Sequence, residues 1–135
     1  MTRTAPRLTQ ALLQNPGRLL LRWTDGFTCT LHLPDMPMAL QADLEDDGYT
    51  MVLRPGDQEY SAPELYKLAA WQENKAQKPA DFREARQKLN MTQEHLAAIL
   101  DISRRTIGYY EDGTLLVPKV VTMAMKQLAT ECAAA

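Results

Sequence analysis

Cysteine and histidine are both scarce in this chain, with two residues of each. Cys29 and Cys132 lie far apart, and His32 and His95 have no partner at the spacing of a metal site. The chain also has no sequence motif of a Ser/His/Asp catalytic triad, and it has no Gly-rich loop of the kind that binds phosphate. These absences argue against an enzyme, and we expect no catalytic residue, cofactor or metal ion.

Long apolar runs are also absent. No segment approaches the roughly 20 apolar residues that a membrane-spanning helix needs. The N-terminal MTRTAPRLTQ has no continuous apolar core of the kind found in signal peptides. Two isolated cysteines without an export signal are typical of the reducing cytoplasm, where both would stay free thiols. We therefore expect a cytoplasmic protein with no membrane partner.

The chain has no excess of positive charge. The net charge is −2, with 8 basic and 10 acidic groups in residues 1–79 and 7 of each in residues 80–135. Contacts with phosphates supply most nonspecific affinity for DNA, so this balance excludes binding through a global positive field. Any affinity for DNA must come from local placement of charge or from dimerisation.

The N-terminal part has the texture of a small β-rich domain. Short β-like runs alternate with turn residues, among them Asn15-Pro16-Gly17 and Asp25-Gly26. Ser61 and Glu64 have the spacing of a helix start. We predict a domain over residues 1–75, with strands at about 7–13, 18–24, 27–33 and 49–53 and a helix at about 62–74.

From Ala80 onward the apolar residues follow a helical period. We predict a linker over residues 76–80 and an all-helical domain over residues 81–135, whose first helix lies near 80–89. The predicted fold class is therefore α+β, with a β-rich α/β domain followed by an all-α domain.

The segment TQEHLAAILDISRRTIGYYEDG, residues 92–113, is the most informative part of the chain. Thr92 and Ser103 are each good N-caps, and a turn of three residues, Leu100-Asp101-Ile102, separates the two helices that they begin. Ala97 is small at the point where the helices must cross. This spacing is that of a helix-turn-helix, whose second helix lies in the DNA major groove.

The outward positions at the start of the second helix are Arg104, Arg105, Gly108 and Tyr109. Arginine is the commonest reader of guanine, through paired hydrogen bonds to O6 and N7. Gln93, at the start of the preceding helix, can hold a phosphate. An isolated Arg pair would more simply be surface charge, and Tyr109 could equally serve packing.

Residues 81–130 resemble the phage-repressor/Cro-type (Xre-like) helix-turn-helix family through the string T-Q-x-x-L-A-x-x-L-x-I-S-x-x-T-I-x-x-Y-E-x-G. The resemblance implies a lambda-repressor-like domain that binds double-stranded DNA. It also implies a structural pair between Arg86 and Glu111. The DNA-binding residues that we predict are Gln93, Ser103, Arg104, Arg105, Thr106, Tyr109 and Lys119.

Three positions depart from the family pattern. Asp101 stands where Gly is usual in the turn, and Gly108 lowers the helix propensity of the reading helix. The loop Thr114–Pro118 lacks the basic residues that many relatives carry, so that Lys119 is the cation remaining there. We expect modest affinity for DNA per domain.

The N-terminal strings GRLLLRWTDG and VLRPGDQEYSAPELY resemble a small bacterial α/β domain of unassigned function. Arg54 stands where that domain usually carries its second Trp. The domain occurs alone, beside small toxin genes, or fused to helix-turn-helix domains. This resemblance implies a possible toxin partner for residues 1–75.

Together these observations predict a bacterial transcriptional regulator that binds an inverted repeat as a homodimer, with dimer contacts in the N-terminal domain or the last helix. Autorepression of a small operon, as the antitoxin of a toxin–antitoxin pair, is the role that the resemblances favour. The alternative is a protein-interaction module whose helix-turn-helix no longer binds DNA, and the neutral charge favours it.

Overall fold

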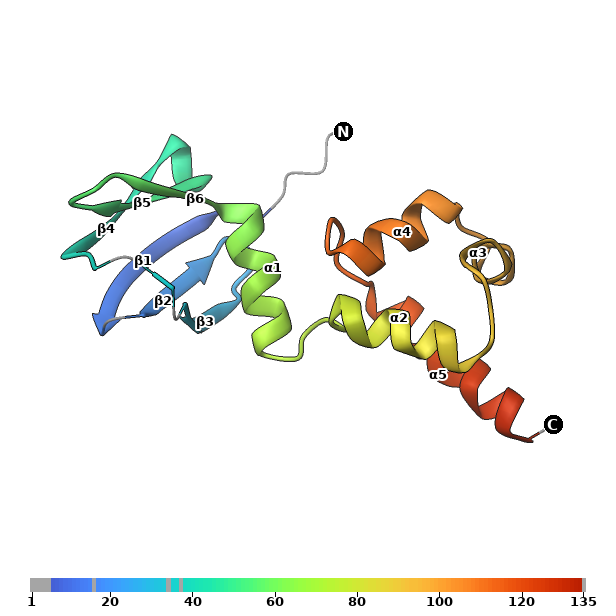
Figure 1. Ribbon diagram of the computed structural model, residues 1–135. Helices are drawn as coiled ribbons and strands as arrows, with labels where there is room; N and C mark the ends of the chain where they lie inside the picture. Colours follow the sequence, from blue (N-terminus) through green and yellow to red (C-terminus); the bar gives the residue numbers. More distant parts are fainter. Residues whose placement is uncertain (1–5, 16, 34, 37, 135) are drawn as a thin grey trace. The chain divides into compact units, whose positions relative to one another are not determined.

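The computed structural model describes residues 6–15, 17–33, 35–36 and 38–134, and its contacts divide the chain into two units, Met1–Glu73 and Asn74–Ala135 (Figure 1). Six strands and one helix belong to the first unit, and four helices of the described chain belong to the second. The predicted α+β class is confirmed. In chain order the elements are β1 (Leu8–Asn15), β2 (Arg18–Trp23), β3 (Thr28–His32), β4 (Gln41–Glu45), a 3-10 turn (Asp46–Gly48), β5 (Thr50–Arg54), β6 (Gln58–Ser61), α1 (Ala62–Gln72), α2 (Pro79–Lys88), α3 (Gln93–Leu100), α4 (Arg104–Asp112) and α5 (Lys119–Ala134).

The first unit consists of two antiparallel three-stranded sheets, ordered β1-β2-β3 and β4-β5-β6. Alternate residues of β2, namely Leu19, Leu21 and Trp23, are buried, as a strand with one face on a core requires. The sheets contact each other through β1 and β4, and α1 contacts both sheets through β3 and β6. The apolar core therefore lies between the two sheets and α1.

The strands β4 and β6 are absent from the prediction, which places one strand in this region. Both are short and polar, reading QADLE and QEYS, and neither has enough apolar residues to stand out by periodicity. Each pairs with an edge of the apolar strand β5. Backbone hydrogen bonds to β5 thus give β4 and β6 their strand conformation.

The predicted turn at 15–17 includes Pro16, which lies outside the described residues.

The acidic run Glu45–Asp47 forms the connection between β4 and β5. Glu45 pairs with Arg54 at 2.7 Å, and Asp47 pairs with Arg7. Gly48 follows at φ +91°, and a Cβ there would lie 2.3 Å from the Leu8 carbonyl oxygen, so only glycine fits. The run therefore has a structural explanation in ion pairs, and no group of three or more potential metal ligands occurs in the described part of the chain.

Cys29 lies in the core of the first unit, facing inward from β3. Its thiol donates to Glu73 Oε1 at 3.3 Å. Burial, reinforced by this carboxylate, raises the pKa of the Cys29 thiol to about 12. Cys29 therefore remains a protonated, unreactive thiol at neutral pH.

The second unit is a bundle around Phe82, Leu96, Ile107 and Met125. Phe82 is fully buried and meets Tyr110 edge to face, with ring centroids 5.5 Å apart. The predicted linker, residues 76–80, lies within this unit, because Pro79 begins α2 and Gln77 forms a β-bridge with Val117. No helix among the described residues is both long and apolar enough to cross a membrane.

Candidate nucleic-acid interface

Helix α3 begins and ends through local signals. The Thr92 side chain accepts a hydrogen bond from the His95 amide at 3.1 Å, which caps the first turn. At the other end Asp101 takes the left-handed conformation, with φ 57° and ψ 45°, and its amide bonds to the carbonyls of Ala97 and Ala98. Asp101 thus provides the helix end that glycine usually provides, and α3 stops after two turns.

Helix α4 begins directly after this turn. The Ser103 hydroxyl accepts a hydrogen bond from the Thr106 amide at 3.1 Å and lies 2.8 Å from the Thr106 hydroxyl. The helix ends at Gly113, whose φ of 84° gives a left-handed cap. Ser103 therefore holds the first turn of α4, and the two hydroxyls lie together at its N-terminal end.

The two helices pack closely through small and apolar residues. Ala97 on α3 is 5% exposed, and Leu96, Ile107 and Tyr110 are buried around it. These residues alternate at helical spacing with exposed ones, so each helix presents one face to the core and the other to solvent. The exposed face of α4 includes Arg104 and Arg105.

An ion pair between Arg86 and Glu111 joins α2 to α4. Arg86 Nε donates to Glu111 Oε2 at 2.8 Å and Nη2 donates to Oε1 at 3.1 Å, while Nη1 donates to the Met91 carbonyl at 2.8 Å. The side chains are 13% and 7% exposed. The hydrogen bond to Glu111 raises the pKa of the Arg86 guanidinium, despite its partial burial. The pair has the geometry of a structural clamp that fixes the orientation of α4 against α2.

A second ion pair, which the sequence analysis missed, lies at the surface. Arg104 Nε contacts Glu94 Oε1 at 2.9 Å, and both side chains are more than 60% exposed. Glu94 is the second residue of α3 and Arg104 the first of α4, so the N-termini of the two helices lie side by side. The exposed Arg105 makes no hydrogen bond or ion pair with any residue that the structure describes.

The remaining predicted site residues occupy different parts of this surface. Gln93 and Thr106 lie at the same paired helix ends and are half-buried, as is Tyr109 one turn further along α4. Lys119 is exposed at the start of α5, beyond the loop that follows α4. The structure thus brings Gln93, Ser103, Arg104, Arg105 and Thr106 together and places Lys119 elsewhere.

Residues 82–119 match a family model described as helix-turn-helix. Over this segment the chain is similar to helix-turn-helix domains of the phage-repressor type. A crystal structure of a protein from Nitrosomonas europaea, described as a candidate DNA-binding protein, is similar over 90% of this chain and 84% of that chain, with 18% identity and a TM-score of 0.43. A comparison with curated proteins finds no match.

At the helix-turn-helix surface, the negative charge of Glu94 partly neutralises the positive charge of Arg104, because the two side chains form an ion pair. Changing Glu94 to Gln removes a negative charge beside the N-terminus of α3, where a phosphate would bind, and releases Arg104. We expect Glu94→Gln to increase DNA affinity several-fold, for specific and nonspecific duplexes alike. Fluorescence anisotropy titration of the full chain measures this, with Glu84→Gln on α2 as the matched control. A lower affinity for the specific duplex would instead show that Glu94 positions Arg104 for reading.

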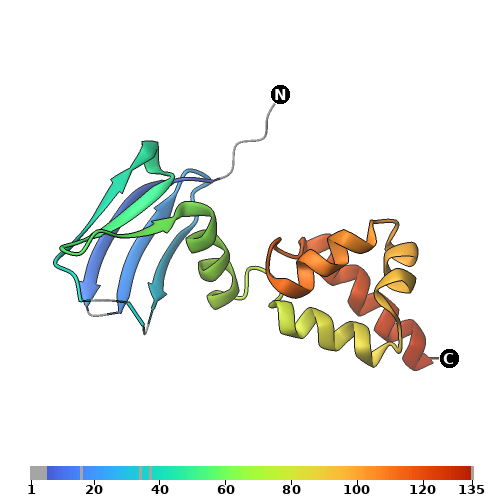
Figure 2. The same ribbon diagram turned by 45° about the horizontal axis from the view of Figure 1, so that its top comes forward.

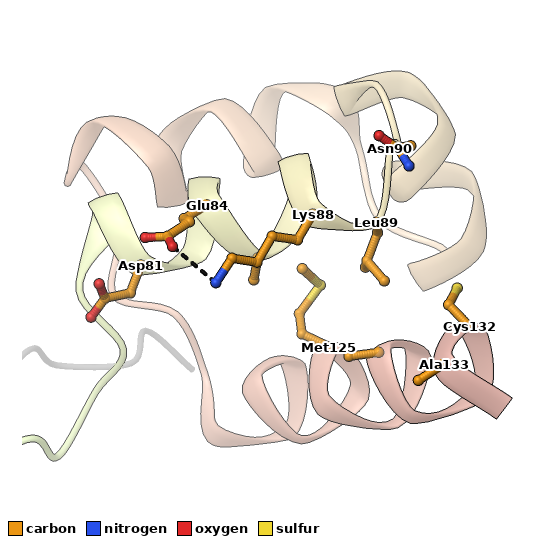
Figure 3. A pocket seen from close by; sticks show the side chains of 10 residues that line it. Asp81, Glu84, Lys88, Leu89, Asn90, Met125, Cys132 and Ala133 are labelled. Atoms are coloured by element: carbon orange, nitrogen blue, oxygen red, sulfur yellow. Dashed lines mark ion pairs between the residues drawn. The ribbon is translucent and has the colours of Figure 1, made fainter.

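A hollow of about 820 Å³ lies between α2 and α5 (Figure 3). Leu89 and Met125 point into it, and Lys88 pairs with Glu84 at 3.0 Å along its edge. None of its lining residues comes from α3 or α4. We therefore assign it no part in the DNA interface.

Proposed function

We propose that this protein is a sequence-specific DNA-binding transcriptional regulator, in which α4 enters the major groove. The observation that supports this most strongly is the contact between Arg104 and Glu94, because it brings the N-termini of α3 and α4 to one exposed surface. Two helix N-termini with free backbone amides and two exposed arginines form a surface suited to phosphates and base edges.

The proposed roles follow from position. Arg104 and Arg105 read bases, with Tyr109 beside them, while Gln93, Thr106 and Lys119 contact the sugar–phosphate backbone. Ser103 caps the reading helix and keeps Thr106 in place. Gly108 allows DNA to approach the backbone of α4 closely. A Cβ at this position would meet nothing within 4 Å, so the backbone there is open to solvent. No step of this function requires catalysis or a cofactor.

We further propose that the protein acts in the bacterial cytoplasm as a homodimer on an inverted repeat and represses its own operon. A single helix-turn-helix buries too little surface for high affinity, and the two-fold symmetry of a dimer matches two half-sites about one helical turn apart. The antitoxin role, with a toxin bound to the first unit, rests on the resemblance of residues 17–26 and 52–66. We propose that the two units are separate domains.

Selection of bound sequences from random duplex DNA, using the full chain, tests this function. We expect an enriched inverted repeat whose half-sites contain guanine, the base that arginine reads best. Failure to enrich any sequence, together with affinity that is insensitive to salt, would reject the DNA-binding function. That outcome would support the protein-interaction module, which the neutral charge of residues 80–135 also favours.

A further inference from the structure

A hollow of about 740 Å³ in the second unit gathers basic residues that are distant in the sequence. Two lie in the segment before α2 and two on α5. We call this hollow the lysine groove, lined by Lys75, Lys78, Lys119 and Lys126. Asp81 is the acidic residue of its lining. Four ammonium groups with one carboxylate give the groove a net positive charge, in a chain whose total charge is −2.

The lysine groove is held in shape by contacts across it. Gln77, which lies between Lys75 and Lys78, forms a β-bridge with Val117. The Thr122 hydroxyl on α5 donates to Gln77 Oε1 at 3.3 Å. Val117, at the base of the groove, is 3% exposed. The segment that carries two of the lysines is therefore attached to the start of α5, which carries the others.

Most of this charge is not neutralised within the unit. Lys78, Lys119 and Lys126 take part in none of the ion pairs found among the described residues. By contrast, Lys88 on α2 is paired with Glu84. Like charges that share a groove repel one another, and an anion bound among them relieves this repulsion. The groove therefore suits a ligand with several negative charges.

The position of the groove relates it to the reading helix. The loop after α4 returns against that helix, since the Leu115 amide donates to the Tyr109 carbonyl at 3.2 Å. Figures 1 and 2 show the start of α2 and the segment between α4 and α5 at the end of the bundle away from α3. The two segments that contribute Lys78 and Lys119 to the lysine groove therefore lie at the end of the bundle where α4 ends.

We propose that the lysine groove binds the phosphodiester backbone of duplex DNA flanking the bases that α4 reads. This inference deepens the proposed function and depends on it. The groove compensates for the loop Thr114–Pro118, which carries no basic residue. Lys119 then acts as one member of a cluster, together with lysines that lie outside the helix-turn-helix segment.

Lys78→Gln and Lys126→Gln, singly and together, test this proposal in the full chain. Each phosphate contact that is lost should reduce the slope of log affinity against log salt by about 0.9, so we expect about 2 for the double variant. The loss should be equal for the selected operator and for unrelated DNA, because phosphates carry no sequence information. Lys88→Gln is the matched control, and its slope should equal that of the parent protein.

Two further measurements separate the possible outcomes. Trimming the flanking base pairs of the operator should remove the difference between the parent and the double variant. An unchanged slope in the double variant overturns the proposal. It does so even if the groove binds inorganic tripolyphosphate, because the groove would then bind an anion other than DNA. If Arg105→Ala still abolishes recognition in those cases, the regulator function stands and only the lysine groove assignment fails. If neither change alters DNA binding, the proposed interface on α4 fails as well.

Discussion

Replacing Arg105 by Ala is expected to weaken binding to a selected operator by about 1–3 kcal/mol, or roughly five- to 150-fold. Arg105 is exposed on the first turn of α4 and makes no ion pair with the described residues, so its guanidinium is available to a guanine edge. The same change should weaken binding to unrelated DNA much less. Titrations with operator and with scrambled duplex at one fixed salt concentration measure the ratio.

Arg22→Ala serves as the control for Arg105→Ala, since it removes the same charge from an exposed position on β2 in the other unit. The double variant with Arg104→Ala should lose nearly all preference for the operator. Its circular dichroism should stay that of the parent protein, because both side chains are exposed and lie outside the core. Full retention of operator preference in the double variant would show that Arg104 and Arg105 do not read the bases.

Replacing Glu111 by Ala should lower the free energy of unfolding of the helical unit by about 3 kcal/mol. The Glu111 carboxylate is 7% exposed and accepts two hydrogen bonds from Arg86, which itself is 13% exposed. Removing the carboxylate leaves a poorly solvated guanidinium without its counter-charge, which costs more than the pair itself contributes. Denaturant unfolding followed by helical circular dichroism measures the change.

Two related variants make this prediction specific. Arg86→Met combined with Glu111→Leu removes both charges and should recover most of the lost stability, as buried pairs replaced by apolar residues often do. Trp23 and Trp71 both lie in the first unit, so their fluorescence reports on that unit alone. If the units are separate domains, the fluorescence transition should not move in any of these variants. A cost below about 1 kcal/mol for Glu111→Ala would show that the pair is dispensable.

The helix-turn-helix could be predicted from the sequence because its signals are local. Thr92 and Ser103 begin their helices through hydrogen bonds to amides three residues on. Asp101 ends α3 in a conformation that aspartate tolerates. Ala97 and Ile107 have the helical spacing that directs them into one core. Such contacts depend on neighbours in the chain, so their residue types and spacing are sufficient.

The strands β4 and β6 show the opposite case, because their polar sequences acquire a strand conformation only from pairing with β5. The predicted linker likewise became part of the helical unit through a bridge between Gln77 and Val117, 40 residues apart in number. Neither pairing leaves a periodic pattern in the sequence. Pairing partners in sheets are selected by the whole fold, and a single short segment carries little information about them.

The amino-acid sequence by itself determined the helix-turn-helix, its caps and the exposed arginines, since these depend on contacts within a few residues. Only the tertiary structure decided which charges meet. It placed Glu94 against Arg104 and gathered lysines from two segments into one groove. Charges interact through space at distances that the order of residues does not specify, so the electrostatic character of the surface emerges only once the chain has folded.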